Sequence, residues 1–124
     1  MEDNKLDFQV IRYEEQYKSQ TLELLGLLWS NRDAEACKEY FKWRYEDCPY
    51  VDNPLLFLSV IDGKVIGVLG HMVQVFLING IRQNVCVPVD GVVLSDYRRF
   101  GIYNRMLVEG IRLISQLKPE FDFK

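Results

Sequence analysis

Two arginines and a glycine at the start of an expected helix have the types and spacing that point most directly to a ligand. Arg98, Arg99 and Gly101 stand just before an apolar periodic segment that begins near Ile102. Unpaired N–H groups and the positive end of a helix dipole favour a phosphate at such a position, and a glycine allows close approach to the backbone. The sequence contains neither the GxGxxG dinucleotide-binding pattern nor the GxxxxGK[ST] P-loop. We therefore expect a small anionic ligand held by a different loop.

Two titratable side chains lie in the apolar segments before these arginines. Asp90 is the only acidic residue between Asp62 and Asp96, and His71 is the only histidine of the chain. A carboxylate in an apolar strand is costly unless it meets a partner or faces a cleft, so Asp90 is a candidate functional residue. The alternative is a bulge or turn carboxylate beside Gly91.

The elements that must position these residues follow from the periodicity of the sequence. Partial alternation of β-branched and aromatic residues predicts a strand over residues 8–13, and apolar runs predict strands over residues 55–61, 64–78 and 81–94. The Asp-Gly and Asn-Gly pairs between the last three predict tight hairpins. Pro88 implies that the last of these strands is an edge strand or is distorted. Three- and four-residue spacing predicts helices over residues 14–30 and 34–45 and from 102 until Pro119 ends it. The apolar residues expected to be buried on this third helix are Ile102, Met106, Leu107, Ile111, Ile114 and Leu117.

Composition limits the class of protein. The chain has 124 residues, of which 48% are hydrophobic and 27% charged, as expected for a single globular domain. Its net charge of −3 argues against a nucleic-acid partner. Residues 1–62 carry 13 acids and 7 bases, whereas residues 63–124 carry 5 acids and 8 bases. The basic excess is therefore local and surrounds the expected anion site.

Residue counts also exclude several kinds of site. The three cysteines form no CxxC pair, and with one histidine they predict neither a disulfide framework nor a zinc site. The N-terminus lacks the pattern of a signal peptide, and the most apolar stretch, residues 65–78, is too short to span a bilayer. We expect a cytoplasmic protein with no bound metal and no membrane span.

The segment from Val92 to Asn104 resembles the signature of the GCN5-related N-acetyltransferases (GNATs), which is a strand, then [QR]-x-x-G-x-[GA], then a helix. Arg98 fills the first position and Gly101 the glycine, whereas Tyr103 departs from the final Gly or Ala. The expected order β-α-α-β-β-β-α-(β) is also similar to that of the family. The resemblance implies an α/β (α+β) fold with a mixed, mostly antiparallel sheet and helices on both faces. The aromatic-rich residues 40–54 look like those of bacterial members that acylate sugar amines.

The resemblance implies acetyl-CoA as co-substrate and no metal. It implies that Val92 and Leu94, with Val93 between them, pair their backbone with the pantetheine arm. It also implies that Arg98 and the backbone N–H groups of the following turn hold the pyrophosphate; the residues of this turn are Arg99, Phe100, Gly101, Ile102, Tyr103 and Asn104. The alternative is that the two arginines are solvated charges flanking a helix.

The resemblance also implies roles in catalysis. Asp90 or a water would remove the proton of a small-molecule or peptide amine, which then attacks the thioester directly. His71 is a candidate for substrate contact or, alternatively, a hydrogen-bonded core residue. A covalent intermediate on Cys86 would need a second histidine to activate it, and none is present. Tyr97 and Tyr103 are candidate acids for the leaving thiolate, although the family's usual tyrosine acid lies beyond the third helix.

The family fold continues beyond the third helix with further strands and a helix, of which residues 121–124 could begin only the first. We therefore expect residues 1–124 to be one GNAT-like domain without its C-terminal part, with an exposed sheet edge through which copies could associate. Two alternatives to an N-acyltransferase stay open. One is a non-catalytic GNAT-like domain that binds CoA or a partner protein, and the other is a small interaction module that binds a different phosphate.

Overall fold

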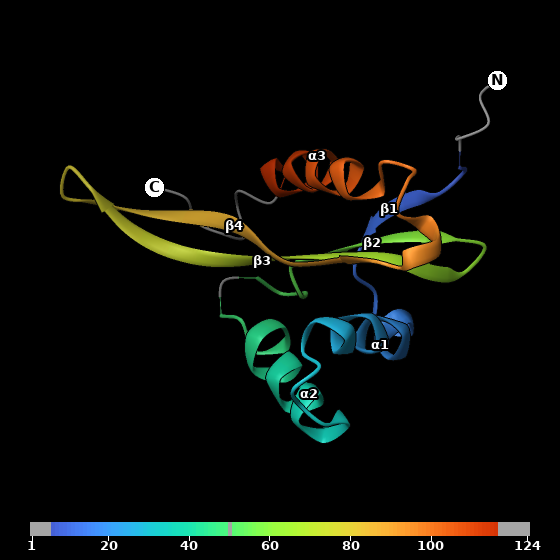
Figure 1. The fold of residues 1–124 in the computed structure, drawn as a ribbon. Helices are drawn as coiled ribbons and strands as arrows, with labels where there is room; N and C mark the ends of the chain where they lie inside the picture. Colours follow the sequence, from blue (N-terminus) through green and yellow to red (C-terminus); the bar gives the residue numbers. More distant parts are fainter. Residues whose placement is uncertain (1–5, 50, 117–124) are drawn as a thin grey trace.

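Four strands form one antiparallel sheet with helices on both faces (Figure 1). The computed structural model describes residues 6–49 and 51–116, so the expected strand at 121–124 and the predicted helix end at Pro119 lie outside the described residues. The sheet order is β1-β2-β3-β4, which confirms the expected α+β fold. The elements are β1 (Gln9–Arg12), α1 (Lys18–Leu28), α2 (Ala34–Phe41), β2 (Leu56–Ile61), β3 (Lys64–Ile78), β4 (Ile81–Val93) and α3 (Ile102–Ser115).

Two tight turns connect the strands of the β2-β3-β4 meander. The φ values are 49° at Asp62 and 78° at Gly63, and 52° at Asn79 and 79° at Gly80. All four residues therefore occupy the left-handed region. Asn, Asp and Gly tolerate this region, which two-residue hairpins of right-handed twist require. Both predicted hairpins are therefore confirmed.

Proline in β4 is accommodated because β4 is an edge strand among the described residues. Pro88 lies opposite His71, and the N–H of His71 donates to the carbonyl of Leu55, just before β2, at 2.9 Å rather than to β4. The pair Pro88–His71 is thus a non-hydrogen-bonded pair, and the position of the missing proline N–H faces the open edge. The expectation of an edge position is confirmed.

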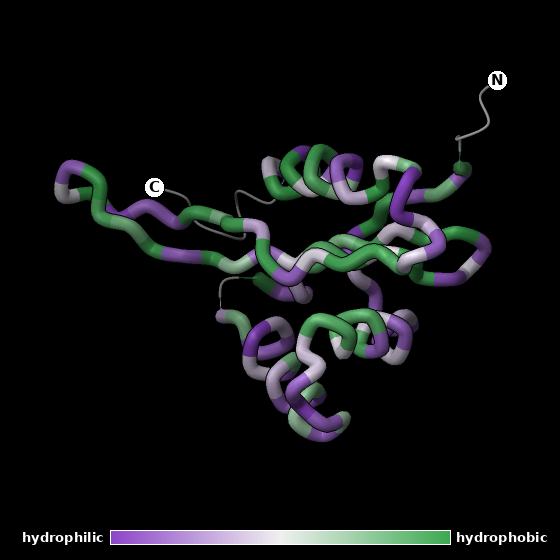
Figure 2. Tube along the Cα trace, in the orientation of Figure 1, coloured by the Kyte–Doolittle hydropathy of each residue, from purple (hydrophilic) through white to green (hydrophobic). Residues whose placement is uncertain are grey.

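The paired strands β3 and β4 continue past the rest of the sheet as a projecting hairpin (Figure 1). The turn at the end of this hairpin is polar in Figure 2, whereas the strand residues next to the turn are apolar; of these, Leu77, Ile78 and Ile81 are more than half exposed. The sheet thus has a covered half, which carries the helices, and an uncovered half.

Helices α1 and α2 cover one face of the sheet, and apolar residues of both helices face inward. Leu24, Leu25, Cys37 and Phe41 are buried in one core with residues of β2 and β3. Leu28, at the end of α1, is instead 42% exposed.

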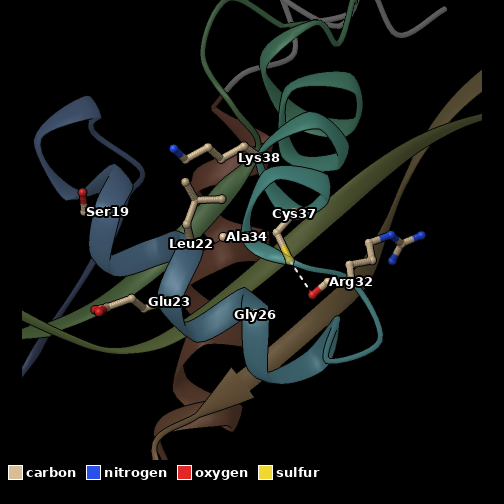
Figure 3. A pocket seen from close by; sticks show the side chains of 8 residues that line it. All are labelled: Ser19, Leu22, Glu23, Gly26, Arg32, Ala34, Cys37 and Lys38. Atoms are coloured by element: carbon tan, nitrogen blue, oxygen red, sulfur yellow. Dashed lines mark hydrogen bonds between the residues drawn. The ribbon is translucent and has the colours of Figure 1, made fainter.

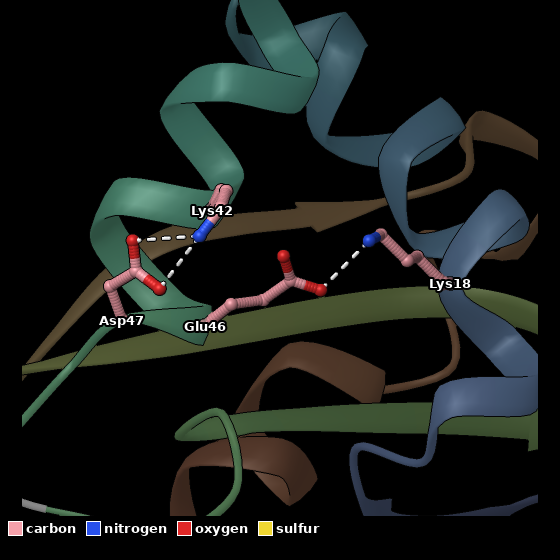
Figure 4. A network of polar contacts seen from close by, with 4 residues as sticks. All are labelled: Lys18, Lys42, Glu46 and Asp47. Carbon is pink, nitrogen blue, oxygen red and sulfur yellow. Dashed lines mark hydrogen bonds and ion pairs between the residues drawn. The ribbon is translucent and has the colours of Figure 1, made fainter.

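The segment after α2 is a π-helical turn (Lys42–Glu46) rather than a continuation of the α-helix to residue 45. The N–H of Asp47 donates to the carbonyl of Lys42 at 2.8 Å, which is the i→i+5 bond of a π turn. Two ion pairs hold it in place (Figure 4): Lys18 to Glu46 at 2.8 Å and Lys42 to Asp47 at 3.0 Å. The first of these pairs ties the turn to α1.

Helix α3 covers the other face of the sheet (Figure 1). Ile102 and Met106 are fully buried in a second core, as predicted, and Gly110 is buried as well. The expectation that Ile111 is buried is wrong, since Ile111 is 65% exposed. The buried stripe runs through Gly110, whose lack of a side chain brings the helix close to Phe57 and His71.

Candidate active site at the β4 edge

The β3–β4 pairing contains a bulge at the expected catalytic carboxylate. Leu69 pairs with Gly91 and Gly70 pairs with Val89, so Asp90 is an extra residue without an opposite partner. Its φ of 45° lies in the left-handed region. Non-glycine residues in this region cost of order 1–3 kcal/mol and are concentrated at functional sites.

The Asp90 side chain is held on the α1–α2 face by three side chains, one from the end of α1 and two from the π-helical turn. Tyr45 Oη donates to Oδ2 at 2.5 Å, and Trp29 Nε1 donates to Oδ1 at 3.4 Å. Arg44 Nε lies 3.0 Å from Oδ2, and both side chains are 14% exposed. The carboxylate thus has the partners that its position requires, and it keeps limited contact with solvent. Both the predicted base and the alternative bulge carboxylate are compatible with this geometry.

Residues of the expected pyrophosphate turn are placed at the N-terminus of α3. Gly101 is the N-cap residue with a φ of 70°, and no side chain caps the helix. The first N–H groups of the helix therefore lack intrahelical partners. Arg98 Nε donates to the carbonyl of Val93 at 2.8 Å, while Arg99 is exposed and Phe100 packs partly into the α3 core.

A hollow of about 470 Å³ brings most of these residues together along the β4 edge. Its walls come from the end of α1, the end of β4 and the start of α3. Sequence reasoning missed two lining residues, Leu28 and Gly91. A glycine inside a predicted strand is a signal available for Gly91, whereas the sequence offers none for Leu28. The lining residues are Leu28, Gly91, Val92, Val93, Arg98, Gly101, Ile102, Tyr103 and Asn104.

The backbone groups at this edge differ from the expectation. The N–H of Leu94 donates to the carbonyl of Ile66 at 2.9 Å, so it is not free to pair with a pantetheine arm. Because inward and outward backbone groups alternate along an antiparallel strand, Val92 also faces β3. Gly91 and Val93 are the residues whose backbone faces the open edge.

His71 lies on the opposite, α3 face of the sheet and is not brought together with Asp90. It is buried, packs edge-on against Phe57 with ring centroids 5.2 Å apart, and its Nδ1 has no partner among the described residues. Burial lowers the pKa of His71 to about 4, so the imidazole is neutral near pH 7. His71 lines a separate hollow of about 530 Å³ between β4 and α3, together with Cys86.

The environment of Cys86 does not activate its thiol. Burial, and to a lesser extent the neighbouring Cys48, raise the pKa of Cys86 to about 11. A thiol rather than a thiolate is therefore present near neutral pH, and the thiol is the weaker nucleophile. No group of three or more potential metal ligands occurs among residues 6–49 and 51–116, and no helix there is long and apolar enough to cross a membrane.

A further groove of about 470 Å³ lies between α1 and α2 (Figure 3). Cys37 points into this groove, and its thiol is directed toward the carbonyl oxygens of Trp29 and Arg32, each at 3.9 Å. The groove contains none of the residues that the sequence marked for chemistry.

Comparison with known proteins supports the fold. No family model matches the sequence, and no curated protein matches it. Among solved structures, an aminoglycoside N-acetyltransferase in complex with CoA matches with a TM-score of 0.71 and 15% identity, covering 89% of this chain and 70% of that chain. The same enzyme has been solved with a CoA bisubstrate analogue.

Two other acetyltransferases match over similar lengths. A GNAT family acetyltransferase from Staphylococcus aureus has a TM-score of 0.67 and 16% identity, covering 90% of this chain and 81% of that chain. A glucosamine-6-phosphate N-acetyltransferase from Arabidopsis thaliana has a TM-score of 0.64 and 18% identity, covering 90% of this chain and 77% of that chain. The chain therefore has the fold of the GNAT acetyltransferases.

Proposed function

We propose that this protein is an acyl-CoA-dependent N-acyltransferase that transfers an acetyl group to a primary amine. The observation that carries the proposal is the hollow at the β4 edge, because it joins the uncapped start of α3 to the end of β4. The fold is the one in which solved N-acetyltransferases bind CoA. Acetyl-CoA would supply an activated acyl thioester.

The donor set along this hollow suits a CoA pyrophosphate. The N–H groups of Ile102, Tyr103 and Asn104 lie in the first turn of α3, where the helix dipole favours an anion. Gly101 leaves its surroundings open, since nothing lies within 4 Å of where a Cβ would stand. The backbone of Gly91 and the N–H of Val93, which face the open edge, would bind the pantetheine arm in place of Val92 and Leu94, whereas the Val93 carbonyl already accepts from Arg98.

Asp90 is the proposed base for the amine. It stands next to Gly91, which lines the hollow, and its carboxylate lies on the α1–α2 face. An amine approaching from that face would meet the carboxylate beside the acyl group. His71 would contact the acceptor only from the α3 face, so we assign it no proton transfer.

Replacing Gly101 tests the cofactor site. Gly101→Ala adds a methyl group at a φ of 70°, and we expect CoA affinity to fall at least tenfold in calorimetric titration, because the first turn of α3 must shift. Gly80→Ala is the matched control, since Gly80 has a φ of 79° and equally open surroundings but lies at the hairpin tip. Equal affinity of the two variants would reject the pyrophosphate assignment.

Replacing Asp90 separates catalysis from binding. Asn tolerates the left-handed region and keeps the size of the side chain, so Asp90→Asn should bind CoA normally. We expect turnover to fall about 100-fold or more, as is typical when a general base is removed. CoA binding by a wild-type protein that acetylates neither glucosamine 6-phosphate nor neamine would instead favour the non-catalytic alternative.

Four narrower expectations belong to the same proposal. The acceptor is a small-molecule amine, as for the aminoglycoside acetyltransferase solved with its bisubstrate analogue. The chain is one GNAT-like domain of the bacterial type, and the protein is cytoplasmic. Copies associate through the open β4 edge, which analytical ultracentrifugation would detect.

A further inference from the structure

We propose that Tyr45 and Arg44 are positioning residues that hold Asp90 Oδ2, so that Oδ1 is the atom that receives the proton of the amine. This inference rests on the proposed function and assigns a role within that site. It follows from how the two carboxylate oxygens of Asp90 differ in their partners.

Tyr45 is built into the sheet at the bulge itself. It is 2% exposed, and its hydroxyl lies above Gly70, where a Cβ would overlap Tyr45 Oη. Gly70 is the residue of β3 at which the register shifts around Asp90. The absence of a side chain at Gly70 therefore makes room for the hydroxyl that donates to Asp90 Oδ2.

Tyr45 remains a hydrogen-bond donor over the working pH range. Burial, followed by the hydrogen bond to Asp90, raises the pKa of its hydroxyl well above the ordinary value of 10.0. A neutral phenol has one proton to donate, and here that proton goes to Oδ2. The contact thus orients the carboxylate without supplying a second titrating group.

Arg44 adds charge at the same oxygen. Its Nε lies 3.0 Å from Oδ2, but this N–H has no hydrogen-bond partner among the described residues, so the contact is an ion pair without a well-directed hydrogen bond. Arg44 Nη1 is directed instead to Tyr40 Oη, at 2.5 Å. The guanidinium is therefore anchored beside Oδ2 rather than free to swing away.

The π-helical turn explains why two consecutive residues reach one carboxylate. Arg44 and Tyr45 both belong to this turn, which is fixed to α1 through the Lys18–Glu46 ion pair. Single π turns inside helices occur frequently at functional sites. The geometry of the turn directs both side chains of the pair toward the β4 bulge.

The two oxygens of Asp90 are left in different states. Oδ2 faces Tyr45 and Arg44, whereas Oδ1 has only the Trp29 contact at 3.4 Å, beyond the usual range for an N–H···O bond. Oδ1 thus has a free lone pair. In the reaction, the amine N–C bond forms as the C–S bond breaks, the amine proton passes to Oδ1, and the departing thiolate finally takes up one proton.

A measurement without substrate tests the positioning alone. In Tyr45→Phe, we expect amide hydrogen exchange at Val89 and Val92, the β4 residues that pair with β3 on either side of the bulge, to accelerate at least tenfold relative to the rest of β4. Tyr13→Phe is the matched control, because Tyr13 is 5% exposed on the same face and its hydroxyl has no partner among the described residues. Unchanged exchange at the bulge would overturn the positioning role.

A double-mutant cycle tests the link to catalysis. We expect Tyr45→Phe to lower kcat about tenfold with glucosamine 6-phosphate or neamine while the Kd of CoA stays within twofold. The double variant with Asp90→Asn should be no slower than Asp90→Asn alone, because Tyr45 acts through that carboxylate. Independent, multiplicative losses would overturn the positioning role and leave the proposed function standing. Absence of wild-type turnover would overturn the proposed function, and with it the role of Oδ1.

Discussion

The two titratable residues that the sequence singled out lie on opposite faces of the sheet and in opposite environments. Asp90, on the α1–α2 face, accepts a hydrogen bond from Tyr45 at Oδ2, has a cation beside the same oxygen, and has Trp29 Nε1 at 3.4 Å from Oδ1. His71, on the α3 face, is 5% exposed, and its Nδ1 has no partner in the described part of the chain. The α1–α2 face thus holds partners for a charged side chain, whereas the α3 face keeps the imidazole neutral.

This difference shows how little the depth of a polar residue says about its role. A buried charge persists only where partners are built around it, whereas an unpartnered buried imidazole loses its charge instead. Asp90 is therefore the residue of the two for which the fold supplies a dedicated environment. The following substitutions run from the largest expected effect to the smallest, with the control for the first placed directly after it.

Gly70→Ala should have the largest effect of these substitutions, because it disturbs the contact between Tyr45 and Asp90 on the α1–α2 face. The added methyl would overlap Tyr45 Oη and force the ring away from Asp90. We expect a loss of about 3 kcal/mol in the free energy of unfolding, from overpacking and from the lost hydrogen bond to a charged group, together with a fall in turnover. Urea unfolding and steady-state assays would measure both.

Gly67→Ala is the control on the same strand. Its Cβ would lie 3.1 Å from the end of the flexible Met106 side chain on the α3 face, so we expect a loss below about 1 kcal/mol and little change in kcat. Similar losses in the free energy of unfolding for Gly70→Ala and Gly67→Ala would mean that the α1–α2 face around Asp90 is packed no more tightly than the α3 face.

His71→Gln tests the α3 face through pH. Because the pKa of His71 is lowered to about 4 in the folded protein from an ordinary value of 6.5, the unfolded chain takes up a proton first as the pH falls. We expect the wild-type protein to lose up to about 3 kcal/mol between pH 6.5 and 4 that the glutamine variant keeps. The measurement is the free energy of unfolding from urea titrations across this pH range. If it changed with pH equally in the wild-type protein and in His71→Gln, the folded protein would take up the proton on His71 as readily as the unfolded chain does.

Leu77→Lys, at the uncovered end of the sheet, should have the smallest effect. Leu77 is 73% exposed at the hairpin tip, so the free energy of unfolding should change by no more than about 0.5 kcal/mol. CoA affinity should not change either, because the tip lies outside the hollow that we assign to the cofactor. A shift in thermal unfolding beyond a few degrees would show that this surface packs against something.

Sequence patterns predicted those features that depend on neighbouring residues. The Asp-Gly and Asn-Gly turns, and with them β3 from Lys64 to Ile78, follow from the backbone preferences of a few residues. The turn around Gly101 follows in the same way from a glycine placed before an amphipathic segment. Local chemistry was sufficient for all of these.

Features that depend on distant partners were not predicted. The contact between Tyr45 and Asp90 joins residues 45 positions apart, and the bulge depends on how β3 pairs with β4. Ile111 fits the helical period, yet the stripe that packs on the sheet runs through Gly110, because only a residue without a side chain fits against Phe57. Helical periodicity identifies an apolar face but not the part of it that the sheet covers.

The π-helical turn between Lys42 and Glu46 makes the site sensitive to chain length at a place remote from it in sequence. A π turn holds one more residue than the α-helical turn that it replaces. Deleting one residue there would restore the shorter turn and remove the extra residue by which Arg44 and Tyr45 both reach Asp90. Related chains without that residue would have to hold the β4 carboxylate in another way, so a one-residue gap would separate two architectures of the same site.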